Sequence, residues 1–104
     1  MTTPTEEQLF ARWDTLPESL REALFSETNS DFLWKTCEDE HLPEEKINVV
    51  AKVMGYVLLG FIHPEDVARE LKERLNLDPK SAKTIEDALK GRIFTPLAAD
   101  LSTA

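Results

Sequence analysis

Residues 43–60 read PEEKINVVAKVMGYVLLG, and this stretch decides the fold of the chain. Its apolar side chains recur at helical spacing along one side, and further apolar residues occupy its other faces. The first set is Ile47, Val50, Ala51, Met54, Val57 and Leu58, and the second is Val49, Val53 and Tyr56. A helix that is apolar nearly all round must be covered by neighbouring elements. The stretch therefore predicts a buried central helix, at about residues 43–60, with the other elements wrapped around it.

Prolines mark where the other helices begin. Pro17, Pro43, Pro64 and Pro79 each open a short segment rich in acidic residues, lysine or serine, and proline suits the first helical position. Gly60 is suited to ending the central helix. The chain contains three glycines and no run of alternating β-branched residues, so strands are not expected. We predict an all-α fold.

The expected elements follow from these boundaries. We predict helices at about 5–14, 17–25, 31–40, 43–59, 64–75 and 79–94, with a polar break at 26–30. The last two form a pair that resembles a helix-turn-helix. We expect Asp78 and either Asn29 or Ser30 to act as helix caps, and His63 to cap the fifth helix or close its junction with the fourth. The length of 104 residues suits one domain. We assign 1–97 to a compact bundle of five to six helices, and 98–104 to a flexible tail.

Negative charge is concentrated in the N-terminal half. Residues 1–45 contain twelve Asp and Glu against three Lys and Arg, whereas residues 46–104 contain eight against nine. The net charge of −8 is therefore a sum of −9 and +1. This distribution predicts either a solvated surface or an acidic surface for a basic partner. It also disfavours loose binding to nucleic acid or to an anionic membrane.

Several classes of protein are not indicated by this sequence. The longest apolar stretch is too short for the roughly 20 residues of a membrane span, and no export signal is visible at the start, so a cytoplasmic protein is expected. With Cys37 as the only cysteine, an intramolecular disulfide is excluded. We find no glycine-rich phosphate loop, nucleophile elbow or dinucleotide fingerprint. No catalytic residue and no cofactor are predicted, so we do not expect an enzyme.

Cys37 and His41 are four residues apart and share one helix face. They could form half of a zinc site, with His63 or nearby acidic residues completing it. Nothing in the sequence places those further ligands. The alternative is that Cys37 is a buried apolar residue and His41 a polar helix end.

Two tryptophans are the candidate partner-binding residues. Trp34 lies off the apolar stripe of its helix and Trp13 precedes a turn, and tryptophan is common at interface hot spots. We therefore predict a small protein-binding or regulatory protein, with another protein as its partner. Self-association is an open alternative, because the central helix has more apolar faces than a small bundle easily covers.

DNA binding is the second functional hypothesis. The helix expected at 79–94 bears Lys80, Lys83, Lys90 and Arg92, as a DNA-reading helix of a helix-turn-helix pair needs for phosphate contacts. Glu86 and Asp87 lie in the same helix and repel phosphate. The overall charge of −8 weakens the hypothesis further.

Residues 55–97 contain three features in order. An apolar helix ends in Leu-Gly-x-Ile-His-Pro-Glu, a pair of amphipathic helices follows, and the segment closes with Ile-Phe-x-Pro-Leu. In these features the chain resembles a group of small all-helical bacterial proteins with no assigned activity. The resemblance implies a compact helical unit ending near Leu97. It implies no functional residue.

Overall fold

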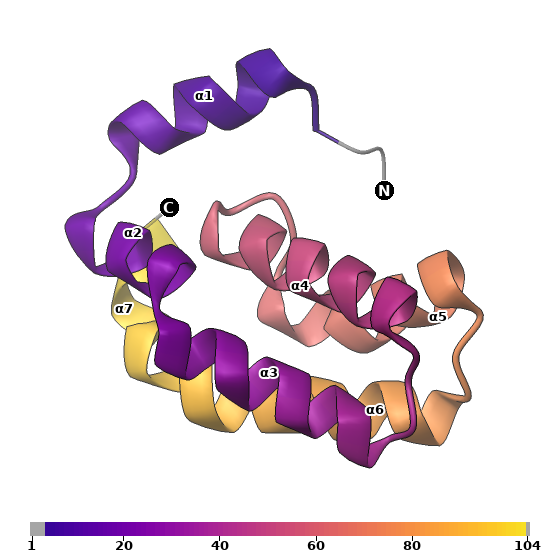
Figure 1. Cartoon of the computed structure of the whole chain (residues 1–104). Helices are drawn as coiled ribbons and strands as arrows, with labels where there is room; N and C mark the ends of the chain where they lie inside the picture. The colour runs from indigo at the N-terminus through magenta and orange to yellow at the C-terminus, as the bar shows by residue number, and fades with distance from the viewer. Residues whose placement is uncertain (1–3, 104) are drawn as a thin grey trace.

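The computed structural model describes residues 4–103, and within this range every regular element is helical (Figure 1). The α-helices are α1 (Glu6–Thr15), α2 (Glu18–Phe25), α3 (Glu27–Asp39), α4 (Glu44–Leu58), α5 (Val67–Leu75), α6 (Pro79–Leu89) and α7 (Ala98–Thr103). A 3-10 turn, Pro64–Asp66, precedes α5, and a π-helical turn, Lys90–Phe94, and a 3-10 turn, Thr95–Leu97, join α6 to α7. The all-α prediction is confirmed.

The helix α4 is the central element, as the sequence predicts. It packs against α2, α3 and α5, and it buries six apolar side chains. These are Ile47, Val50, Val53, Met54, Val57 and Leu58. Fully burying one such side chain contributes about 1.5–3 kcal/mol to folding, so α4 organises the hydrophobic core. Gly60, with φ of 88°, follows the end of α4 in the left-handed conformation that glycine adopts without strain.

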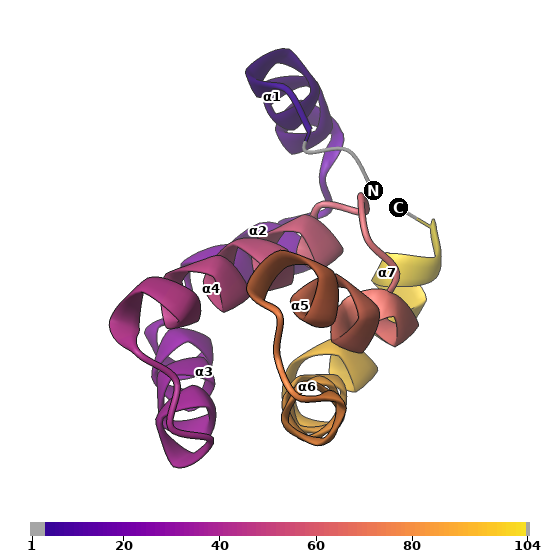
Figure 2. The ribbon, with the colours of Figure 1, turned by 90° about the vertical axis from the view of Figure 1, so that its right-hand side faces the viewer.

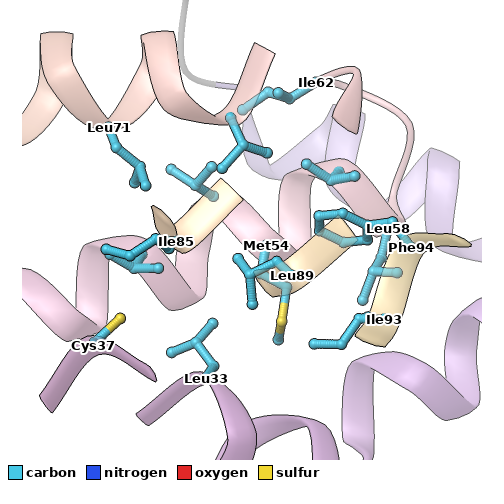
Figure 3. Packing of buried hydrophobic residues seen from close by; sticks show 14 of the residues in the cluster. Leu33, Cys37, Met54, Leu58, Ile62, Leu71, Ile85, Leu89, Ile93 and Phe94 are labelled. Atoms are coloured by element: carbon cyan, nitrogen blue, oxygen red, sulfur yellow. The ribbon is translucent and has the colours of Figure 1, made fainter. Parts of the chain in front are cut away.

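The core lies where α3, α4, α5 and α6 meet. Figure 3 shows Leu33 and Cys37 of α3 pointing toward Met54 of α4 and toward Ile85 and Leu89 of α6. Ile93 and Phe94, from the π-helical turn, close one end of the cluster. Cys37 has no exposed surface, so the core contains its thiol.

Helices α5 and α6 pack against each other, joined by residues 76–78, and one carboxylate ties them together. The side chain of Glu86 on α6 is 3% exposed, and its Oε1 accepts a hydrogen bond of 3.2 Å from the backbone N–H of Ala68. Ala68 lies in the first turn of α5, where N–H groups have no partner within the helix. Because Asp66 at the cap position makes no side-chain cap bond, Glu86 serves as a cap from the neighbouring helix.

We expect Glu86→Ala to lower the free energy of unfolding by about 1–3 kcal/mol, because it leaves the part-buried N–H of Ala68 without an acceptor. Urea unfolding followed by circular dichroism measures this change. Asp87→Ala is the matched control, since Asp87 also pairs with Lys83, at 3.2 Å, but is 61% exposed. An exposed pair is worth about 0–1 kcal/mol. Equal losses in the two variants would contradict the capping role of Glu86.

Helix α1 lies apart from the bundle. Figures 1 and 2 show it as an arm outside the packed helices, and it contains no buried residue. Its start is stabilised locally, because Thr5 Oγ1 accepts from the N–H of Gln8 and Gln8 Oε1 accepts from the N–H of Thr5. The buried side chain of Leu16 fixes the point where the chain enters the core.

The structure corrects four expectations about boundaries and caps. The polar break at 26–30 is wrong, because Ser26 caps α3 by accepting from the N–H of Asn29, and the helix begins at Glu27. Neither Asp78 nor the exposed His63 makes a side-chain cap bond. The expected tail forms α7 instead, where Ser19 Oγ of α2 donates to Asp100. Residues 1–3 and 104 lie outside the described range.

Candidate functional site

Trp13 is the predicted candidate that the structure places among other aromatic side chains. Its ring is half-buried and meets the ring of Phe25 edge to face, with the centroids 5.4 Å apart. Phe25 is 76% exposed, and Phe10, on the same helix as Trp13, is 69% exposed. Exposure of this size is unusual for two phenylalanines in a small domain, whose large apolar side chains are mostly buried.

These rings line an open apolar groove between α1, the end of α2 and the end of α4. We call it the aromatic groove. It measures about 270 Å³, and it is lined by Leu9, Phe10, Trp13, Phe25 and Leu59. Its lining residues come from three separate elements, so their grouping depends on the position of the α1 arm.

Two arginines hold α1 in this position. Arg12 Nε donates to the backbone oxygen of Leu59, at 2.7 Å, and so satisfies a carbonyl at the end of α4. Arg21 Nη2 donates to the backbone oxygen of Trp13, at 2.7 Å, and its guanidinium lies 5.1 Å from the centre of the Trp13 ring. Within residues 4–103, Arg12 Nη2 and Arg21 Nε are buried without an acceptor. Both arginines are half-buried and donate to backbone oxygens, and Arg21 also lines an open groove beside the aromatic groove.

The exposed charge around the aromatic groove is negative. Glu18 and Glu22 of α2 line an adjoining open groove together with Trp13, Leu16, Arg21 and Phe25. On α1, three exposed acidic residues lie within one turn of Phe10: Glu6, Glu7 and Asp14. Among the described residues, none of these five carboxylates forms an ion pair. We call these five residues the acidic border.

Trp34, the second predicted candidate, lies elsewhere. It is half-buried on α3 and packs against the core. It does not line the aromatic groove, so the structure does not bring the two tryptophans together in one surface. Trp34 stays a prediction, and the groove around Trp13 is the better-defined candidate.

The residues of the DNA hypothesis are spread over α6 and the π-helical turn. Lys80 is exposed, whereas Lys83 is held between Glu86 and Asp87, at 2.9 and 3.2 Å. Hydrogen bonds to these two carboxylates raise the pKa of Lys83. Lys90 is half-buried, and the guanidinium of Arg92 lies 5.3 Å from the ring centre of Phe32.

Two of the three basic residues of α5 are also paired, and the third, Lys72, is exposed. Arg69 lies 3.3 Å from Asp66, and Arg74 lies 3.1 Å from Glu70. Each pairing reduces the positive charge available to a phosphate group. DNA binding stays a prediction, and its test is a gel shift at about 50 and about 200 mM salt, over which phosphate contacts weaken steeply.

Cys37 and His41 do not converge. Cys37 is fully buried, and His41 is exposed just after α3 with φ of 62°. In the described part of the chain, no three His, Cys, Asp or Glu side chains gather in an arrangement that could hold a metal ion. Over the same residues, no helix combines the length and apolar character needed to cross a membrane.

The sequence indicates Trp13 as a candidate but does not indicate the exposure of Phe10 and Phe25. Helical spacing places Phe10 on one side of its helix with Leu9 and Trp13. The available signal was its local setting, since Glu6, Glu7 and Asp14 lie three or four residues away and so share its face of the helix. A phenylalanine among three carboxylates is poorly placed to enter a core.

Comparison of the chain with protein-family models, with curated proteins and with solved structures finds no match. The resemblance of residues 55–97 to small bacterial helical proteins therefore stays a prediction.

Proposed function

We propose that this protein is a non-enzymatic protein-binding module and that the aromatic groove receives its partner. The observation that supports this most directly is the exposure of Phe10 and Phe25 beside the half-buried Trp13. Interface hot spots combine a large aromatic anchor with neighbours that exclude water once the partner is bound. The grouping of three aromatic rings on an arm and its adjacent helix fits that arrangement.

The groove is suited to binding for a second reason, which is that α1 contributes little to the core. Helix α1 contains no buried residue and contacts the core cluster through the half-buried Trp13. A surface of this kind can change its contacts on binding without disturbing the packing that stabilises the fold.

Site-specific photocrosslinking tests the proposal. We place p-benzoylphenylalanine at position 10 or 25, with position 84 as the control, because Thr84 is exposed on α6 away from the groove residues. After irradiation of cells that produce the protein, we expect a discrete adduct from positions 10 and 25 that is missing from position 84. An adduct of twice the chain mass identifies a second copy as the partner. No adduct, or the same adducts from all three positions, contradicts the proposal.

A further inference from the structure

We infer that the partner segment is a basic amphipathic helix: a helix with one apolar stripe that enters the aromatic groove and lysine or arginine residues that face the acidic border. This inference rests on the proposed function and adds the chemistry of the partner. The evidence for it is the negative charge of the acidic border and the ion pairs that already engage basic residues of α5 and α6.

The shape of the groove favours a helix. Its apolar lining comes from two neighbouring helices, α1 and α2, and from Leu59 at the end of α4. An amphipathic helix lays an apolar stripe into such a groove, with anchors every three or four residues. The polar residues of that helix then lie on both sides of the stripe, opposite whatever charges border the groove.

The charges select a basic helix. The five carboxylates of the acidic border form no ion pair among the described residues, whereas the half-buried Arg12 and Arg21 donate to backbone oxygens. A partner with lysine or arginine beside its apolar stripe gains attraction from these carboxylates, and an acidic partner is repelled. The acidic border also repels anionic headgroups, so an anionic membrane is disfavoured as the ligand.

A second copy of the chain fits this surface poorly. Two copies meeting groove to groove place Glu18 and Glu22 of one beside the same residues of the other. The acidic border of one copy could instead contact the basic residues on α5 and α6 of another copy. This contact is also disfavoured, because Arg69, Arg74 and Lys83 are already paired with carboxylates of their own chain. The acidic border is therefore better matched by positively charged residues of another protein.

Binding of model peptides tests the inference on the full-length protein. The probe is a synthetic amphipathic helix of leucine and lysine, and the matched probe replaces every lysine with glutamate. By calorimetry we expect the lysine peptide to bind at least about tenfold more tightly than the glutamate peptide. Raising the salt concentration from about 50 to about 500 mM should weaken its binding several-fold, because charge attraction is screened.

Two pairs of variants locate the binding. Phe10→Ala combined with Phe25→Ala should weaken binding of the lysine peptide about tenfold or more, because both anchors are lost. Glu18→Lys combined with Glu22→Lys should weaken it by a similar factor. The control, Glu38→Lys combined with Asp39→Lys, makes the same change in net charge at exposed positions of α3 and should weaken it far less. Equal effects from the two charge pairs indicate general attraction to an acidic protein and overturn the inference.

The possible failures are distinguishable. If both peptides bind equally and both lose affinity in the Phe10→Ala and Phe25→Ala variant, the groove binds helices without preference for charge, and only the inference fails. If the lysine peptide does not bind, the inference fails, and the crosslinking at positions 10 and 25 decides the proposed function separately. Loss of both the peptide binding and the crosslinked adducts contradicts both.

Discussion

Replacing Phe94 with alanine is expected to lower the free energy of unfolding by about 3–5 kcal/mol, the cost of removing a buried phenylalanine. Phe94 is 2% exposed, and it closes the end of the core next to Ile93 and Leu58 (Figure 3). Its removal takes away the contacts of the ring and leaves a cavity that the surrounding helices fill only in part. A domain of this size has a total stability of about 5–15 kcal/mol, so the variant loses at least about a fifth of it and up to nearly all of it.

The matched control is Phe25→Ala. The chemical change is the same, but Phe25 is 76% exposed, so we expect its free energy of unfolding to change by less than about 1 kcal/mol, chiefly through the lost edge contact with Trp13. Guanidinium unfolding of both variants, followed by circular dichroism at 222 nm, measures the difference. A similar loss in both variants would mean that Phe25 is covered by another part of the molecule or by a second copy.

This contrast connects stability with the proposed function. The side chains that hold the fold together are buried in the core cluster, whereas Phe10 and Phe25 of the aromatic groove are exposed. A loss of partner binding in Phe25→Ala can therefore be assigned to the surface, because the core residues are untouched. The position of α1 depends on different contacts, the hydrogen bonds that Arg12 and Arg21 donate to backbone oxygens.

The sequence predicted most of the fold because its strongest signals are local. A helix that is apolar on every face has to be central, and proline before acidic residues marks a helix start; α2, α4 and α6 begin within one residue of the positions expected from these signals. Two of the errors arise where a tertiary contact replaces a local one. Glu86 takes over as the cap of α5, and α7 forms at the end of the chain, where its Asp100 accepts from Ser19.

The candidate site was less predictable from the sequence, because it depends on which charged side chains contact one another in the folded protein. Counting residues shows the acidic N-terminal half, but it cannot show that Arg12 and Arg21 donate to backbone oxygens while the carboxylates near them are exposed. Nor can it show that Lys83 is held by Glu86 and Asp87. Helical spacing places Trp13 and Phe10 on one face, yet whether that face is covered depends on how far the α1 arm stands from the bundle.

The thiol of Cys37 should react at least about 10³-fold more slowly in the native protein than in the unfolded chain at pH 8, because only the thiolate reacts. Burial, and then the negative charge of Glu40, raise the pKa of Cys37 from 9.0 to about 12. At pH 8 about one unfolded thiol in ten is ionised, against about one native thiol in 10⁴. Reaction with a disulfide reagent, with and without guanidinium, measures the ratio, and Cys37→Ala gives the background.

The same shift predicts how stability changes in alkali. Well below pH 9 the thiol of Cys37 is protonated in both states, so its contribution to the free energy of unfolding is constant there. Between pH 9 and about 12 the unfolded thiol loses its proton while the native thiol keeps it, so stability falls as the pH rises. Cys37→Ala should remove this part of the alkaline loss. Rapid labelling of the native protein at pH 8 would instead mean that α3 opens from α4 and α6, and the packing of the core around Cys37 would then have to be revised.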